Sequence, residues 1–211
     1  MIHAAAWFGE ENCGVWTPDG RVVRQRAPAL TATEEVTALI GRPVKYFPRM
    51  TVEAQRCVCA AGLALRGARW REDSQEMEIG VVAAGYGGCL EADREYFGDY
   101  VTSGRQLGRA SLFVYTLPTS AACAVSLALG LTGPVLHVQE EGAGEALACH
   151  AERMAADGEA GGMLALWSDR RAAVCLAVGA GEGIGYPAAF QGLRAVSPWQ
   201  LAQNLQAMPT L

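Results

Sequence analysis

Several features that mark common classes of protein are missing from this 211-residue sequence. No apolar run reaches the roughly 18 residues needed to cross a bilayer, and the start, MIHAAAWFGEENCG, has neither the basic region nor the full apolar core of a secretion signal. The net charge is −5, and basic residues are scattered apart from GARWRE around Arg69 and Arg71. We therefore expect a cytoplasmic protein that spans no membrane and binds no nucleic acid.

Common nucleotide-binding and hydrolase motifs are missing as well. No Gly-Lys-Ser/Thr occurs, which excludes a P-loop, and no G-x-S-x-G elbow marks a serine hydrolase. The stretches GYGG at 85–88 and GAGEGIG at 179–185 lack the G-x-G-x-x-G spacing. They predict turns with close backbone approach rather than dinucleotide sites.

Metal and disulfide frameworks are poorly supported by the cysteines. There are seven, at the irregular positions 13, 57, 59, 89, 123, 149 and 175, mostly within apolar stretches. An odd number in a chain of this size favours buried thiols over a disulfide framework. Cys57 and Cys59 are the one close pair, with neither a second pair nor a histidine nearby. We expect no metal and no cofactor.

What is present is enough apolar material for one substantial core. The chain is 51% hydrophobic and 18% charged, so we expect a single domain over 1–211. Apolar runs predict strands at 1–8, 79–84, 135–138, 161–168 and 171–179, and a hairpin turn at 18–20. Helical patterns cover 31–41, 50–68, 91–101, 118–130, 143–157 and a segment from 198. Strands that alternate with helices and are apolar throughout predict a layered α/β domain.

Local patterns give more specific expectations. Thr31 with Glu34 has the spacing of a capping box. The helix at 118–130 consists of small or apolar residues, so it should be buried all round. Cys149 and His150 are adjacent on a helix and point about 100° apart, so they cannot act as a thiol–base pair facing each other. We interpret both as packing residues, with His150 toward the core.

The stretch GPVLHVQEEGAGEALACHAERMAADG, residues 133–158, predicts a buried strand that turns sharply into a helix. Many α/β enzymes place their nucleophile at such a corner, yet Glu140 and Glu141 stand here, with no Ser, Cys or Thr. Carboxylates at the positive end of a helix serve either capping or acid–base chemistry. His3 and His137 lie on predicted strands and are interpreted as core or interface side chains.

Taken in order, four stretches resemble the N-terminal half of a β-ketoacyl synthase of the thiolase-like superfamily, from about Tyr46 to Asp169. They are FPRMTVEAQRCVCAAGLALRGA, EIGVVAAGYGG, SLFVYTLPTSAACAVSLALGLTGPVLHV and ACHAERMAADGEAGGMLALWSD. They are similar, in turn, to the family's early helix, its central strand with a Gly-rich turn, the segment that leads to the nucleophile, and the helix and strand after it. The resemblance implies a thiolase-like αβα half-fold, a mixed sheet flanked by helices.

Two departures from the family decide the functional expectation. The family's acylated cysteine would fall at Glu141 or Gly142, and neither residue can carry a thioester. The family's second half supplies the histidines, or His and Asn, of the condensation reaction, whereas only about 40 residues follow Asp169 here and none is a histidine. The resemblance therefore implies a non-catalytic subunit, similar to a chain-length factor, in fatty-acid or polyketide synthesis of the aryl polyene type.

Two rival functions stay open. Glu140 or Glu141 could act as acid or base on an acyl thioester, in decarboxylation or hydrolysis. Alternatively, the Gly-rich turn with Gly85, Gly87 and Gly88 suggests a module that binds an acyl chain.

The resemblance also implies partners. In the family, the strand before the nucleophile pairs across a two-fold axis, so Val135, Leu136, His137 and Val138 should lie at a dimer interface. We expect a homodimer or a heterodimer with a true ketosynthase, and acyl carrier protein as a further partner.

Overall fold

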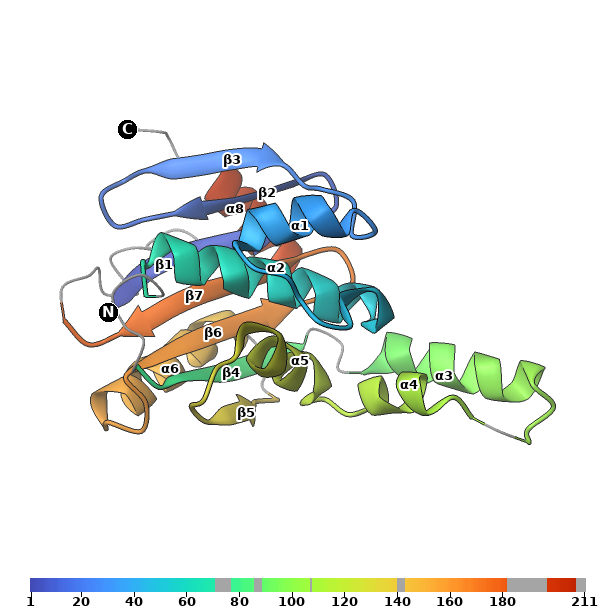
Figure 1. Cartoon of the computed structure of the whole chain (residues 1–211). Coiled ribbons are helices and arrows are strands. Elements are labelled where there is room, and N and C mark those ends of the chain that lie inside the picture. The colour runs from blue at the N-terminus through green and yellow to red at the C-terminus, as the bar shows by residue number, and fades with distance from the viewer. Residues whose placement is uncertain (71–76, 86–88, 107, 140–142, 182–196, 208–211) are drawn as a thin grey trace.

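One seven-stranded mixed sheet organises the computed structural model, which describes residues 1–70, 77–85, 89–106, 108–139, 143–181 and 197–207 (Figure 1). The strands are β1 (Ile2–Phe8), β2 (Asn12–Trp16), β3 (Val22–Arg26), β4 (Ile79–Gly85), β5 (Val135–His137), β6 (Gly162–Ser168) and β7 (Ala173–Gly179). Their order across the sheet is β3-β2-β1-β7-β6-β4-β5. β4 pairs in parallel with both β5 and β6, whereas the other neighbours are antiparallel.

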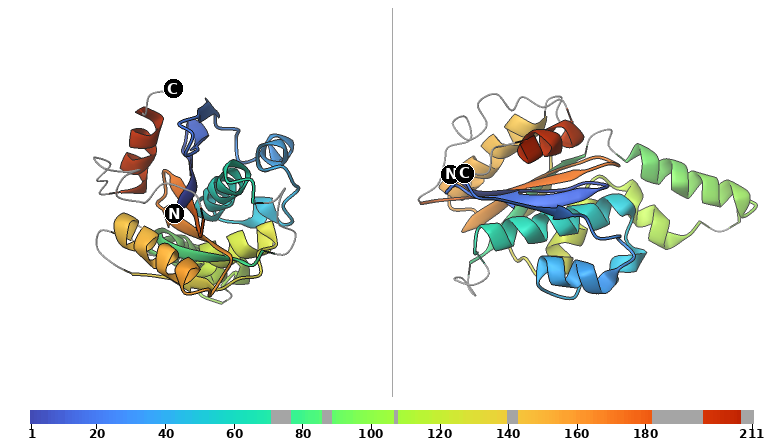
Figure 2. Two further views of the ribbon diagram at one scale, coloured as in Figure 1. Left: turned by 90° about the vertical axis from the view of Figure 1, so that its left-hand side faces the viewer. Right: turned by 90° about the horizontal axis from the view of Figure 1, so that it is seen from above.

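Helices cover both faces of this sheet, as the end-on view in Figure 2 shows. On one face lie α1 (Thr33–Ile40), α2 (Val52–Gly67) and α5 (Ser120–Leu129), with the short helix η1 (Phe47–Arg49) before α2. On the other face lie α6 (Ala143–Ala156) and α8 (Pro198–Ala207). α3 (Leu90–Thr102), α4 (Ala110–Phe113) and η2 (Val114–Thr116) form an arm that extends beyond the sheet (Figure 1). The predicted α/β fold with a mixed sheet and flanking helices is confirmed.

Every residue of β6 and β7 is buried, because helices cover both of their sides. This explains why these strands are apolar, except for Ser168 at the end of β6, instead of alternating. The short polar turn at Asp169, Arg170 and Arg171 predicted that these two strands are antiparallel neighbours. Their antiparallel register confirms this prediction. The hairpin turn between β2 and β3 is confirmed too.

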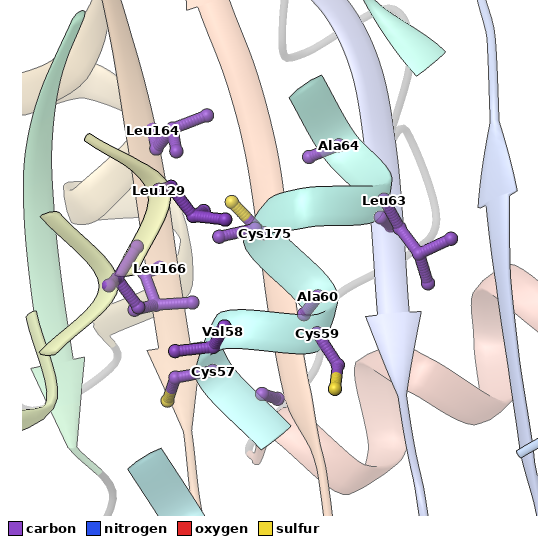
Figure 3. Close-up of a cluster of buried hydrophobic side chains, with 14 of the residues drawn as sticks. Cys57, Val58, Cys59, Ala60, Leu63, Ala64, Leu129, Leu164, Leu166 and Cys175 are labelled. Carbon is purple, nitrogen blue, oxygen red and sulfur yellow. The ribbon is translucent and has the colours of Figure 1, made fainter. Parts of the chain in front are cut away.

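Helix α2 lies almost flat on the sheet and is the centre of the larger core cluster. Residues 54–65 are all buried, and most are Ala, Gly or Cys, which lets the helix approach the strands closely. Figure 3 shows its Val58 and Cys57 facing the side chains of β6 and its axis crossing close to Cys175 of β7. Burial raises the pKa of the Cys57 and Cys59 thiols far above its ordinary value, so both stay neutral.

The cysteine prediction holds for most of the thiols. All seven lie in the described part of the chain, and four of them, Cys13, Cys57, Cys59 and Cys175, are buried. Burial also raises the pKa of Cys13, to about 11. Cys123 and Cys149 are exposed on helices instead.

The expected capping box of α1 and the expected full burial of α5 are both wrong. Helix α1 begins at Thr33 with Ala32 in the cap position and no side-chain cap, so Thr31 and Glu34 form no capping box. Helix α5 is not buried all round: Leu127 is 83% exposed, because α5 packs on α2, β4 and β5 and leaves its outer side uncovered by described residues.

The expectation that Cys149 and His150 of α6 are packing residues is also wrong. Its buried stripe is Leu147, Ala148, Ala151 and Met154, whereas Cys149 and His150 are exposed. His150 precedes Ala151 by one residue, a rotation of about 100°, and therefore points away from the sheet. Neither residue packs in the core.

Among the described residues, no single helix is long and apolar enough to cross a membrane. Two consecutive helical segments, Ala110–Thr116 and Ser120–Leu129, are together long and apolar enough for a membrane span by length and composition only. The chain bends by 110° between them.

Replacing Gly62 by alanine is expected to lower the free energy of unfolding by about 1–3 kcal/mol. A Cβ at Gly62 would lie 2.7 Å from Ile40 Cγ2, so α1 and α2 would be pushed apart. Gly98 in α3 is the matched control, since a Cβ there meets nothing within 4 Å; alanine at Gly98 should stabilise the helix by up to about 1 kcal/mol. Urea unfolding measures both. A Gly62→Ala variant as stable as Gly98→Ala would contradict this packing.

Candidate functional site

A cavity of about 230 Å³ lies at the carboxyl ends of the three parallel strands. β4 contributes Ala83–Gly85, β5 contributes His137, and β6 contributes Leu166 and Ser168. The first turn of α2, the start of α3 and the segment before α5 complete the walls. Open α/β sheets bind ligands at the carboxyl ends of their strands, where chain direction leaves a crevice. This cavity is therefore the candidate site.

The deepest polar contact of the cavity joins α2 to β6. The Ser168 hydroxyl donates a hydrogen bond to Glu53 Oε1 at 2.7 Å, and Ser168 itself is only 4% exposed. Thr51 caps α2 by accepting from the Ala54 amide at 3.3 Å, which fixes the first turn that carries Glu53. The pair thus stands on two rigid elements.

Burial raises the pKa of Glu53 above its ordinary value, because the charged form loses water. The negative charge of Asp169 raises the pKa further, whereas the Ser168 hydrogen bond and the cation of Arg56 act in the opposite direction. Glu53 is therefore a carboxyl whose neutral form is favoured at the wall of a cavity. Carboxyls in clefts whose pKa is raised by burial are candidates for functional roles.

Behind Glu53 lies a partly paired charge cluster. Arg56, one turn further along α2, is 8% exposed, and its Nη2 is 3.8 Å from Glu10 Oε1. Its Nε and Nη1 hydrogen-bond to none of the described residues. Arg171 Nε is 3.7 Å from Glu10 Oε2, and its guanidinium stacks 4.1 Å from the ring of Trp199. The cluster joins α2 to the β6–β7 turn and to α8.

The cavity wall carries more acid than base. Among the described lining residues, the carboxyl side chains are those of Glu53, Glu91 and Glu95, and the one guanidinium is that of Arg170. Burial lowers the pKa of His137, so the imidazole is neutral at neutral pH. An anionic ligand would meet net negative charge here. The wall favours neutral ligands.

The thiol of Cys89 also lines the cavity, at the cap position of α3. Its pKa is raised by burial and by the charges of Asp93 and Glu53. A thiol nucleophile reacts as the thiolate, which this setting disfavours. Cys89 is therefore poorly suited to attack an acyl group.

The predicted site residues fall partly within the structure. Glu140, Glu141 and Gly142, the corner between β5 and α6, lie outside the described residues, as do Gly87 and Gly88. The elements on either side are the predicted strand and helix.

Two predicted positions are described and lie in the cavity wall. Gly85 ends β4, and His137 ends β5. Sequence reasoning missed Glu53 and Ser168, which are 115 residues apart. The one available sign was a serine that closes the otherwise apolar run GGMLALWS.

The segment predicted as an interface lies at one edge of the sheet. β5 pairs with β4, and the Val138 amide continues this pairing by donating to the Ala83 carbonyl at 2.8 Å. In the described part of the chain, the other side of β5 has no strand beside it. Leu136 is 45% exposed there.

Exposed apolar side chains concentrate on the same region of the chain. Of the twelve large hydrophobic side chains that the described residues expose, eight fall between residues 90 and 136: Leu90, Phe97, Val101, Phe113, Val114, Leu117, Leu127 and Leu136. We call these eight the apolar strip. None of the twelve is on α6 or α8. The residues of the apolar strip belong to α3, α4, η2, the segment before α5, α5 and β5.

A family model described as "Beta-ketoacyl synthase, N-terminal domain" matches residues 23–186. No curated protein is similar enough in sequence to count as a match.

Solved structures share the fold at low sequence identity. The ishigamide ketosynthase/chain length factor matches with a TM-score of 0.53 and 18% identity, over 67% of this chain and 47% of that one. A type II polyketide ketosynthase in complex with its acyl-carrier protein, AntDE:AntF, matches with a TM-score of 0.52 and 14% identity, over 84% and 63%. The ketosynthase ApeO in complex with its chain length factor ApeC from Xenorhabdus doucetiae gives 0.46 and 16%, over 74% and 76%. The chain thus spans about half to two thirds of the first two structures, whose likeness confirms the thiolase-like fold.

Removing the Ser168 hydroxyl is expected to raise the pKa of Glu53 further and to destabilise the fold by about 1–3 kcal/mol at neutral pH. Because the folded-state pKa of Glu53 is already raised, the stability gained from its neutral form is present at low pH and is lost as pH rises through that pKa. The penalty of Ser168→Ala should therefore grow with pH. Urea unfolding between pH 5 and 8 measures it.

The matched control is Ser111→Ala, since Ser111 is exposed on α4. It should leave stability within about 0.5 kcal/mol at every pH. A Ser168→Ala penalty that does not change with pH would show that the hydroxyl does not interact with an ionising Glu53.

Proposed function

We propose that this chain, which belongs to the β-ketoacyl synthase family and matches its N-terminal domain over residues 23–186, assists acyl-chain condensation without carrying the acyl chain itself. One observation carries the proposal: residues 138–143 read Val-Gln-Glu-Glu-Gly-Ala, without Cys, Ser or Thr. The resemblance assigns the family's acylated cysteine to this corner, at Glu141 or Gly142. A carboxylate or a glycine forms no thioester.

The cavity supports a role in holding a neutral acyl group. It opens at the carboxyl ends of β4, β5 and β6, beside the strand that leads into the corner. Its walls combine Val, Ala, Leu and Pro side chains, which can contact a hydrocarbon chain, with polar side chains such as those of Thr51, Tyr115 and His137. Glu91 and Glu95 would repel the carboxylate of a malonyl extender. We infer that the chain binds acyl groups and leaves the condensation step to a partner.

A ketosynthase-type partner is the proposed consequence. The chain spans 47% of the length of the ishigamide ketosynthase/chain length factor, and the edge strand β5 with the apolar strip offers a surface for a second subunit. We propose a heterodimer with a cysteine-bearing ketosynthase, or a homodimer, through Val135–Val138. Acyl carrier protein is the proposed donor of acyl groups. The proposed pathway, fatty-acid or polyketide synthesis of the aryl polyene type, follows from the resemblance.

Replacing Leu136 by arginine is expected to weaken association with the partner subunit by at least about tenfold, because a cation would be buried at the interface. Val23→Arg is the matched control: Val23 is 52% exposed on β3, the strand at the opposite edge of the sheet. Copurification and light scattering, with and without a cysteine-bearing ketosynthase, measure both variants. Equal association of the two variants, or a monomer under both conditions, would rule out the β5 interface.

An enzymatic role for the corner glutamates is the rival proposal. If Glu140 or Glu141 were an acid or base, the double variant Glu140→Ala/Glu141→Ala would lose at least about 100-fold in turnover of acyl-carrier thioesters. We expect turnover by the complex to be unchanged, since the proposed chemistry belongs to the partner. Release of acyl groups or CO₂ from labelled thioesters is the measurement. A large loss would replace the non-catalytic proposal with the enzymatic one.

A further inference from the structure

Glu53 differs from the other carboxyls that line the cavity. Glu91 and Glu95 are exposed, and Glu91 is paired with Arg94 at 2.9 Å. Glu53 is partly buried, and among the described residues Ser168 is the one that hydrogen-bonds its carboxyl group. A carboxyl that has lost much of its water at a cavity wall needs a second polar partner.

One oxygen of this carboxyl is left for a ligand, as far as the described residues go. Oε1 accepts the hydroxyl of Ser168, and no described residue hydrogen-bonds the second oxygen, which is therefore the one available to a molecule in the cavity. When the acid is neutral, that second oxygen carries the proton and becomes a hydrogen-bond donor. A donor at this position in the wall favours a ligand with an uncharged oxygen opposite it.

We propose that Glu53, held in place by Ser168, anchors an uncharged oxygen on the acyl group, so that the cavity selects hydroxyacyl or ketoacyl ligands over plain hydrocarbon chains. This inference rests on the proposed function, which supplies the acyl ligand. It goes further by naming the specificity-determining residue and the chemical class of ligand. The volume of about 230 Å³ limits the bound part to roughly eight water-sized groups at about 30 Å³ each.

The protonation of Glu53 links this selection to pH. Several charged or titratable groups surround Glu53 or line the cavity. Those near Glu53 are Arg56 and Cys57 on α2 and Asp169 after β6. Those in the wall are Cys89, Glu91, Glu95, Tyr115, His137 and Arg170. The neutral form, which burial favours, donates to the ligand oxygen. The ionised form cannot donate, so binding of an oxygenated ligand weakens as pH rises through the pKa of Glu53. A plain hydrocarbon ligand lacks this dependence.

The test compares ligands that differ only in one oxygen. The probes are the N-acetylcysteamine thioesters of hexanoic, 3-oxohexanoic and 6-hydroxyhexanoic acids, titrated by calorimetry into the full chain with its partner subunit between pH 5 and 8. An oxygenated ester should bind the wild type about 2- to 12-fold more tightly than hexanoyl thioester, the range of one net hydrogen bond. This preference should decline as pH rises.

Two substitutions separate hydrogen bonding from shape. Glu53→Gln imitates the neutral acid, since its carbonyl accepts from Ser168 and its amide donates; it should keep the preference and lose the pH dependence. Glu53→Leu should lose the preference. Glu34→Gln, at an exposed carboxyl of α1 away from the cavity wall, should change neither. Circular dichroism and thermal melting verify that each variant is folded.

The outcomes distinguish this inference from the proposed function. Equal affinity of the wild type for all three esters would overturn the inference and leave the acyl cavity standing. Retained preference in Glu53→Leu would also overturn it. If no ester binds, the acyl cavity itself is wrong, and this inference falls with it.

Discussion

The parallel pairing of β4 with both β5 and β6 is the constraint on which the candidate site depends. Because the three strands run in the same direction, their carboxyl ends lie at the same end of the sheet. Connections between parallel strands leave that end and return through helices. This arrangement brings the first turn of α2, the start of α3 and the segment before α5 around one cavity. The corner between β5 and α6 begins at the same edge. Small residues of α2 let that helix pack closely enough on the sheet to carry Glu53 to Ser168.

The positions of strands and helices could largely be predicted, because the apolar runs and turn residues act over short distances. EIGVVAAG and GGMLALWS are apolar on both faces, and both became interior strands. Burial within helices was harder to predict. His150 and Leu127 are exposed, because their burial depends on which neighbouring element covers each side of α6 and α5.

The candidate site could be predicted only in part. Gly85 and His137 line the cavity, and each ends a strand that its own sequence predicts. The contact between Glu53 and Ser168 joins residues 115 positions apart. It follows from the order of strands across the sheet, which no local pattern in the sequence encodes. A single glutamate on a helix such as α2 is indistinguishable in sequence from a solvated one.

The cavity and the exposed apolar side chains both fit the proposed role of a binding subunit that acts with a catalytic partner. The cavity wall has a carboxyl at Glu53 whose pKa is raised by burial, a neutral imidazole at His137 and a disfavoured thiolate at Cys89, which is a setting for binding rather than for covalent transfer. Apolar side chains are exposed along residues 90–136, whereas α6 and α8 expose none of the large ones among the described residues. The proposed subunit therefore contributes a cavity and a contact surface. The proposed partner contributes the nucleophile.

The central claim is that this chain forms no covalent acyl intermediate, and intact-mass spectrometry tests it most directly. The full chain is incubated with radiolabelled acyl-carrier thioesters, alone and together with a cysteine-bearing ketosynthase. The account predicts an unchanged mass for this chain in both reactions and an acyl adduct on the ketosynthase. An acyl adduct mapped by peptide sequencing to the segment between β5 and α6 of this chain would contradict it.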